Sequence, residues 1–297
     1  MFIKRTDLAL EARELWQESA ERTTRLMGVK ATKTKLEGYP VTRVDILDHR
    51  GEEALGKPQG SYFTIDLTTF WQRKADFFER AVRAVGTELK ALLPPEGAVL
   101  VVGLGNAAMT PDAVGPLALD SVLITRHLLS AMPKQFAGFR PVAAFRTGVL
   151  GTTGVESAEA VRGLVEEVRP ALVLAIDALA SRRCGRVCAT VQLSDTGIIP
   201  GSGVGNHRSA LNQETLGVPV FAIGVPTVVD SATLAADVLE ESGAEKIDEE
   251  RLRDHEPFMV TTRDIDQQVR DLSKVVGYGI NWALQDLEIE EMNALLS

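Results

Sequence analysis

Two aspartates occupy the positions at which chemistry is most readily assembled in this chain. Asp112 follows the apolar run VLVVGLGN at residues 99–106, and Asp177 closes the run ALVLAID at residues 171–177. Short apolar runs without polar alternation are typical of parallel strands that helices cover on both faces. The carboxyl ends of such strands line the ligand crevice of an open α/β sheet, so the two carboxyl groups are predicted to converge on one substrate. Each could instead cap the helix or turn that follows it.

Glycine-rich motifs offer further candidates. The string GLGNAA at 103–108 fits the dinucleotide fingerprint, but a helix starting at Pro116 begins too late for its N-terminus to hold a pyrophosphate. Asp195 opens the loop DTGIIPGSGVGN, where the favoured interpretation is an Asx turn, because pepsin-like proteases with this tripeptide are all-β and carry two such loops. His207 and Arg208 follow the loop and could orient a substrate carbonyl or carboxylate, or pack on the surface.

The composition narrows the classes of function. The chain has 297 residues, 45% of them hydrophobic and 25% charged, as in soluble globular proteins, and its net charge of −9 disfavours direct nucleic-acid binding. Its apolar runs are shorter than the roughly 20 residues that span a bilayer, and no signal peptide is recognisable, so we expect a cytoplasmic protein without membrane association. Cys184 and Cys188 have no His cluster nearby, so we expect reduced thiols and neither a metal site nor a cofactor.

Alternating helix and strand patterns are predicted to position these residues. Helices are expected at 7–27, 74–93, 116–131, 157–168, 228–242 and from about 266, and strands at 44–46, 63–67, 98–103, 141–146, 171–177, 187–193 and 218–223. This order predicts an α/β fold in one domain over residues 1–297. We expect three layers, with a mostly parallel twisted sheet and helices on both of its faces.

Six ordered stretches carry a family resemblance that covers nearly the whole chain. They are RTDLALE at 5–11, VVGLGN at 101–106 with TPD at 110–112, GVLG at 148–151, AIDALASR at 175–182, the DTG to GVGN loop at 195–206, and GVPTVVD at 224–230. Together they closely resemble the germination protease of spore-forming bacteria. The Gly-x-Gly-Asn loop followed by an Asp is also similar to the hydrogenase-maturation endopeptidases, which implies a related α/β fold.

The resemblance implies an endopeptidase of the spore core that degrades small acid-soluble spore proteins during germination. It places the two essential acids at Asp112 and Asp177, and it implies a homotetramer made as a zymogen. Cleavage between Asp7 and Leu8 would remove a propeptide of residues 1–7, which is shorter than is usual in the family. Substrate-binding or supporting roles are expected for Asn106, Asp195, His207, Arg208 and Asp230.

Three chemical interpretations remain open from the sequence. In the first, one carboxyl of a close pair stays protonated, so the carboxylate can take a proton from water while the acid polarises the peptide carbonyl and protonates the leaving amine. In the second, Asp112 and Asp177 ligate a metal ion with Asp230 as a third carboxylate, and a metal-activated water attacks. In the third, the chain is a non-catalytic α/β module whose glycine-rich loops hold a ligand.

Overall fold

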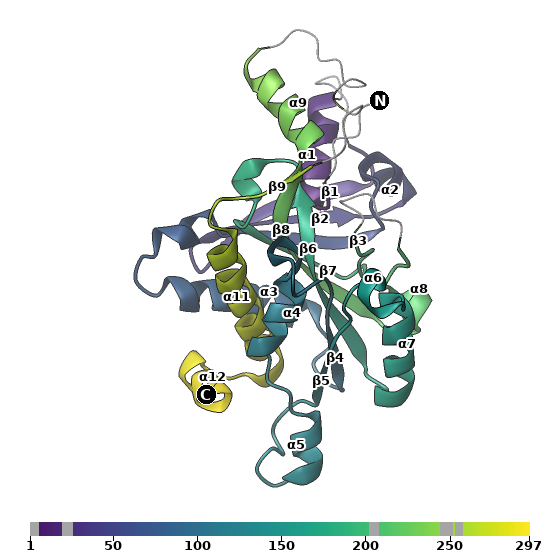
Figure 1. Ribbon diagram of the computed structural model, residues 1–297, viewed down its shortest axis with the longest axis vertical. Helices are drawn as coiled ribbons and strands as arrows, with labels where there is room; N and C mark the ends of the chain where they lie inside the picture. The colour runs from purple at the N-terminus through teal and green to yellow at the C-terminus, as the bar shows by residue number, and fades with distance from the viewer. Residues whose placement is uncertain (1–5, 20–25, 202–207, 244–251, 253–257) are drawn as a thin grey trace.

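A mixed sheet forms the centre of the molecule in the computed structural model, which describes residues 6–19, 26–201, 208–243, 252 and 258–297 (Figure 1). Within these residues the sheet has nine strands in the order β1-β2-β3-β7-β8-β6-β4-β5, with β9 paired to β8. The strands are β1 (Val29–Leu36), β2 (Tyr39–Ile46), β3 (Gly60–Asp66), β4 (Val99–Gly103), β5 (Val142–Arg146), β6 (Leu172–Ser181), β7 (Thr190–Ser194), β8 (Val220–Asp230) and β9 (Met259–Val260).

The α/β class is confirmed, but the prediction of a mostly parallel sheet is wrong. Among the described strands the pairs β4–β5, β4–β6 and β6–β8 are parallel. The pairs β1–β2, β2–β3, β3–β7, β7–β8 and β8–β9 are antiparallel. For β1 and β2 the reason is their connection, a tight turn in which Glu37 and Gly38 both have positive φ, because such a turn produces an antiparallel hairpin.

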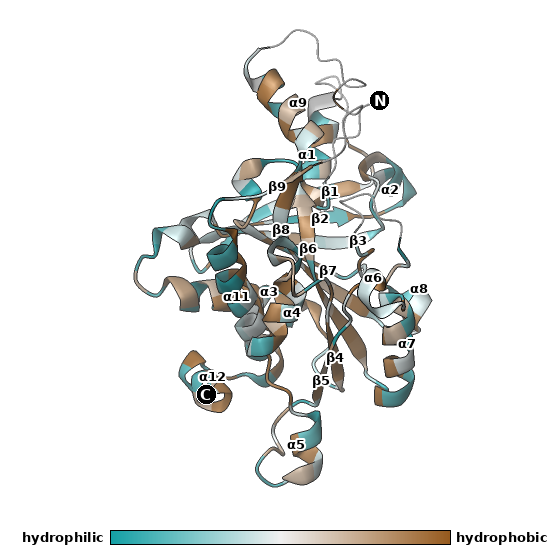
Figure 2. Cartoon of the chain, in the orientation of Figure 1, coloured by the Kyte–Doolittle hydropathy of each residue, from teal (hydrophilic) through white to brown (hydrophobic). Residues whose placement is uncertain are grey.

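Helices flank the sheet and bury its hydrophobic side chains. They are α1 (Ala9–Ser19), α2 (His49–Leu55), α3 (Phe77–Leu92), α4 (Val114–Ala118), α5 (Arg126–Ala131), α6 (Leu150–Thr153), α7 (Ser157–Val168), α8 (Gln213–Leu216), α9 (Ser231–Glu241), α11 (Ile265–Gln285) and α12 (Ile289–Leu296). Figure 1 shows α11 and α4 on one side of the central strands and α7 and α8 on the other. Figure 2 shows hydrophobic residues concentrated along those strands, with mixed hydropathy along α7 and α11.

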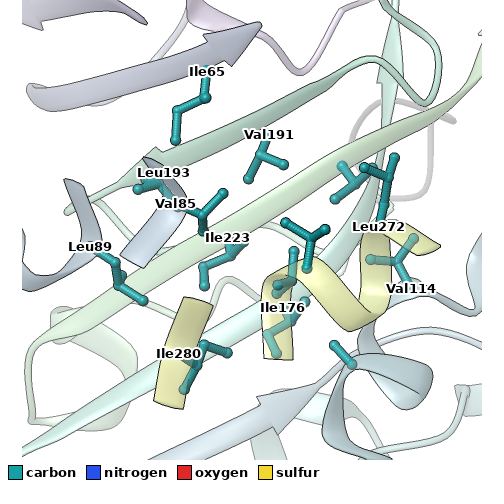
Figure 3. Packing of buried hydrophobic residues seen from close by; sticks show 14 of the residues in the cluster. Ile65, Val85, Leu89, Val114, Ile176, Val191, Leu193, Ile223, Leu272 and Ile280 are labelled. Atoms are coloured by element: carbon teal, nitrogen blue, oxygen red, sulfur yellow. The ribbon is translucent and has the colours of Figure 1, made fainter. Parts of the chain in front are cut away.

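Strand alternation assigns each apolar side chain of the parallel strands to one of two cores. Val101 and Ile176 belong to a cluster with α3, α4 and α11, whose packing Figure 3 shows around Ile176 and Ile223. Leu100 and Ala175, one residue away in each strand, belong to a second cluster with α7 and α8. Successive side chains of a strand point to opposite faces, so uninterrupted apolar runs are buried on both sides.

Several elements differ from their predicted bounds, and two strands and one helix among them bear on the site. β6 continues four residues past Asp177 because residues 178–181 pair with β8, and β8 itself continues to Asp230. The helix expected over 116–131 is broken into α4, a 3-10 turn and α5. At the break, β-branched residues disfavour helix and the backbone N–H of Leu123 binds Asn281 Oδ1 of α11 at 2.8 Å. Local periodicity carries no information on this long-range hydrogen bond.

The described residues also answer two questions raised by the composition. No helix among them combines the length and hydropathy that a membrane-spanning helix requires. Cys184 is exposed, whereas Cys188 is a buried thiol. Burial raises the pKa of the Cys188 thiol to about 12, which makes it a poor nucleophile.

Candidate active site

Asp177 lies on β6 at the level where the neighbouring strand β4 ends. The last registered pair of these strands joins Gly103 and Ile176, and the N–H of Leu104 donates to the carbonyl of Ile176 at 2.8 Å. Asp177 follows at once, with only 4% of its surface exposed. Asp177 is adjacent to Ile176 in the strand, and adjacent side chains point to opposite faces. Because Ile176 belongs to the core with α11, the Asp177 side chain points toward the face that α7 and α8 cover. The sequence places Asp177 at a strand end, whereas the structure places it where β6 loses a partner.

Asp112 is held against the end of β4 by the loop that follows this strand. Its Oδ2 accepts a hydrogen bond from the backbone N–H of Asn106 at 2.8 Å. Gly105 has φ +105°, and a Cβ there would lie 2.1 Å from the Asp112 carbonyl oxygen, so the loop closes only around glycine. The Thr227 hydroxyl of β8 donates to the carbonyl of Pro111 at 2.6 Å, which ties the loop to the central sheet.

Gly103 and Gly115 allow α4 to approach the ends of β4 and of the neighbouring part of β6. A Cβ on Gly115 would lie 2.3 Å from the Leu104 carbonyl oxygen and 2.5 Å from that of Ile176. A Cβ on Gly103 would lie 2.6 Å from the Gly115 carbonyl oxygen. These contacts are between backbones, so they serve close packing of helix on sheet. The glycines of the GLGNAA string thus have a structural explanation that requires no dinucleotide.

The two carboxyl groups interact electrostatically. Burial raises the pKa of Asp177 well above its usual value, and the charge of Asp112 raises it further. Burial also raises the pKa of Asp112, while the Asn106 N–H and the charge of Arg208 oppose this effect. Arg208 lowers the pKa of Asp177 as well, so the half-buried guanidinium is close enough to act on both acids. Both pKa values are thus raised, and that of Asp177 more strongly.

Beyond Ile176, three alternate backbone N–H groups, two in β6 and one just after its end, bind carboxylates. The N–H of Ala178 donates to Asp177 Oδ1 at 2.9 Å, and that of Ala180 donates to Asp7 Oδ2 at 2.8 Å. The N–H of Arg182 donates to Glu11 Oε2 at 2.6 Å. The N-terminal segment therefore lies where β4 no longer reaches, and the charge of Asp7 is among the causes that raise the pKa of Asp177. Leu8, on the far side of the predicted cleavage point, is fully buried.

The other predicted site residues are distributed more widely. Asp195 binds the backbone N–H of Ser61 in β3 at 2.8 Å, beside Gly60, where a side chain would collide with it. Asp230 is the N-cap of α9 and accepts from the N–H of Thr233 at 3.0 Å. Asn106 contributes its backbone to Asp112, while its side chain accepts from the N–H of Ala108. His207 lies outside the described residues.

The placement of Asp230 bears directly on the metal interpretation. Asp177 is registered with Gly224 on β8, so Asp230 lies six residues farther along that strand, or about 20 Å at the usual rise per residue. It therefore does not join Asp112 and Asp177 as a third ligand. In the part of the chain that the structure describes, no three His, Cys, Asp or Glu side chains form a group that could hold a metal ion.

Sequence reasoning missed three residues that shape the site. They are Thr227, which fixes the Asp112 loop, Glu11, whose carboxylate anchors α1 to β6, and Gln192 of β7, which binds the N-terminal backbone. Glu11 carried a usable signal, because an acidic residue amid the apolar positions of an amphipathic helix requires a buried partner. Thr227 and Gln192 carried none, since a polar residue in a strand is ordinary.

In open α/β sheets ligands bind at the carboxyl ends of the strands, which is where the structure places the interacting carboxyl groups of Asp112 and Asp177. Comparison with known families makes this specific, because the model of the germination protease family matches residues 9–242. The chain belongs to this family, which supports a protease role in spore germination.

Individual relatives agree along most of the chain. The germination protease of Caldanaerobacter subterraneus is 44% identical over 321 positions that cover 98% of each chain. That of Clostridium perfringens is 42% identical and covers the whole of both chains. The germination protease of Bacillus cytotoxicus is 44% identical over 80% of this chain and 66% of its own length.

Proposed function

We propose that this chain is an endopeptidase that hydrolyses small acid-soluble spore proteins during germination, with Asp112 as its general base and Asp177 as its general acid. The observation that carries the mechanism is the electrostatic coupling of buried Asp177 with half-buried Asp112 at the end of β4. The substrate class rests on membership of the germination protease family. The homotetramer, the removal of residues 1–7 and the location in the spore core remain proposals from the same resemblance.

The environments of the two acids favour distinct roles. Asp177 is buried and has its pKa raised by burial and by neighbouring carboxylates, so it is the member that holds the proton. Asp112 is more exposed, and both the Asn106 N–H and Arg208 favour its charged form. Asp112 therefore accepts a proton from the attacking water, while Asp177 polarises the peptide carbonyl through a hydrogen bond and then transfers its one proton to the leaving amine. The proton gained by Asp112 then restores the starting state of the pair.

Arg208 has two possible uses at this site, and both follow from its charge. In the free enzyme its charge lowers the pKa of Asp112, against the larger raising effect of burial, and so favours the ionised form of the general base. When a tetrahedral intermediate forms, the same guanidinium can stabilise the negative oxygen. Replacement by Lys retains the charge but loses the planar donors, so Arg208→Lys separates the two uses.

The test is cleavage of a purified small acid-soluble spore protein by the chain and its variants. Asp112→Asn and Asp177→Asn should each lower kcat by at least about 100-fold, the lower end of what positioned acid–base catalysis contributes. Asp195→Asn is the matched control, because Asn retains the acceptor for the Ser61 N–H, and it should retain most of the activity. A wild-type chain that leaves the spore protein intact would contradict the proposal. Loss of activity with a chelator, restored by metal, would instead favour metal assistance.

A further inference from the structure

The chain holds a piece of its own backbone beside the candidate active site. Asp7 donates its N–H to the carbonyl of Ala180 at 2.9 Å, and its Oδ2 accepts from the N–H of Ala180 at 2.8 Å. Ala180 belongs to the part of β6 that has lost β4 as a neighbour. A segment added to an open strand edge in this way is a common mode of peptide recognition, because main-chain hydrogen bonds supply affinity without selecting side chains.

The side-chain amide of Gln192 in β7 binds the same segment through two hydrogen bonds. Its Oε1 accepts from the N–H of Ala9 at 2.8 Å, and its Nε2 donates to the carbonyl of Asp7 at 3.2 Å. The two bonded groups belong to residues two apart and are both main-chain groups. Gln192 itself is buried, with 8% of its surface exposed. It can therefore hold a peptide of another sequence by the same two contacts.

Sheet register places Gln192 and Ala180 within reach of Asp177. Asp177, Gly224 and Gln192 are registered partners on β6, β8 and β7, so the side chains of Asp177 and Gln192 share a face. They lie two strand spacings apart, or about 10 Å, and Ala180 lies about the same distance along β6. An extended peptide of four residues covers about 13 Å. One peptide can thus contact all three residues.

Anchorage of α1 does not require Gln192. The Glu11 carboxylate already joins this helix to β6 and the following turn through the backbone N–H groups of Arg182 and Arg183 and through the side chain of Arg186. Glu11 is fully buried, so these contacts are shielded from water. The contacts of Gln192 are thus additional to an anchor that stands without them.

We propose that Gln192 and the backbone of Ala180 bind the substrate's main chain, and that residues 7–9 of the chain occupy this position in the present structure. The inference rests on the proposed function and adds a peptide-binding subsite to it. Substrate and N-terminal segment then compete for the same hydrogen bonds. Loosening the segment should improve substrate binding, and removing the Gln192 amide should weaken it.

The test measures KM and kcat for cleavage of a small acid-soluble spore protein by chains that mass spectrometry shows to retain residues 1–7, because Asp7 would be lost with the proposed propeptide. Asp7→Ala removes the acceptor for the Ala180 N–H and should lower KM about fivefold, whereas Asp7→Asn keeps an acceptor and should change KM less than about twofold. In the Asp7→Ala background, Gln192→Met should raise KM about tenfold with kcat within about twofold, as expected for loss of two hydrogen bonds made equally in the ground and transition states.

Thr64→Val provides the structural control. Thr64 is registered with Gln192 on β3 and buried, but its hydroxyl has no hydrogen-bond partner among the described residues. The substitution should leave KM within about twofold. Unchanged KM after Gln192→Met, with only a lower Tm, would overturn the inference and make Gln192 an anchor of the N-terminus. If the wild-type chain cleaves no spore protein, the proposed function fails first. Active variants with unaltered KM contradict the subsite alone.

Discussion

Glu11→Gln should destabilise the protein strongly, although it removes a single charge on the first helix. The Glu11 side chain is fully buried. Its Oε2 accepts from the Thr6 hydroxyl and the Arg182 N–H, both at 2.6 Å. Its Oε1 accepts from the Arg183 N–H at 3.1 Å and from Arg186 at 3.0 Å. A glutamine places an NH₂ group against one of these donor pairs, so two donors lose their acceptor.

The expected cost follows from these contacts. Each buried donor left without an acceptor costs about 1–3 kcal/mol, and breaking a buried ion pair costs about 3–5 kcal/mol. We therefore expect the free energy of unfolding to fall by about 4 kcal/mol. For a chain of this size that corresponds to a Tm lower by roughly 10 °C. Urea unfolding followed by far-UV circular dichroism, with thermal unfolding beside it, measures both quantities.

Glu14→Gln is the matched control for this prediction. Glu14 also binds Arg186, through two contacts of 2.8 Å, but its side chain retains 27% exposure. Partly exposed pairs contribute about 1 kcal/mol or less, so this variant should lose little stability. Equal losses for the two variants would refute the reasoning, because they would show that the buried N–H contacts of Glu11 add nothing to a surface ion pair.

Three further predictions concern the site and its support. Asp177→Asn should stabilise the chain at neutral pH, because the pKa of Asp177 is raised in the folded state. The favourable contribution of this carboxyl group to stability is fully present below its unfolded-state pKa and is lost as pH rises through its folded-state pKa. The Tm of the variant should therefore equal that of the wild type in acid and exceed it increasingly toward neutral pH. Gly115→Ala should cost about 3 kcal/mol because its Cβ meets the Leu104 carbonyl, while Gly163→Ala, with open space around it in α7, should add about 1 kcal/mol, and an equal response of the two in urea unfolding would contradict this. Thr227→Val frees the Asp112 loop and should lower kcat about tenfold; unchanged kcat would show that the loop holds its position without this bond.

Much of the central fold was predictable from hydrophobic patterns. The strands expected at 98–103 and 141–146 and the helix expected at 157–168 match β4, β5 and α7 to within about a residue. Strands buried on both faces must be apolar throughout, and an amphipathic helix repeats at its own period, so both leave a local signature. The antiparallel half of the sheet was harder to predict, because half-exposed strands have a weaker hydrophobic pattern than strands buried on both faces.

The candidate site was also predictable from the sequence only in part. Asp112 and Asp177 follow from their position after apolar runs, and the structure brings them into electrostatic interaction. Asp230, which was expected to support the site or to be a third metal ligand, instead caps a helix, because β8 continues to this residue and α9 begins directly after it. The sequence could not distinguish these cases, since a strand-end aspartate looks the same whether it caps a helix or faces a second acid.

The sequence by itself identified Asp112 and Asp177 as candidate site residues, the strands that precede them and the family to which the chain belongs, because these depend on local patterns and long motifs. Only the tertiary structure decided that the N-terminal segment lies beside Asp177, with Gln192 more than 180 residues away holding its backbone. It also decided that Glu11 is buried against the end of β6. Such contacts depend on where distant parts of the chain meet after the sheet has formed, and residue order carries no local trace of them.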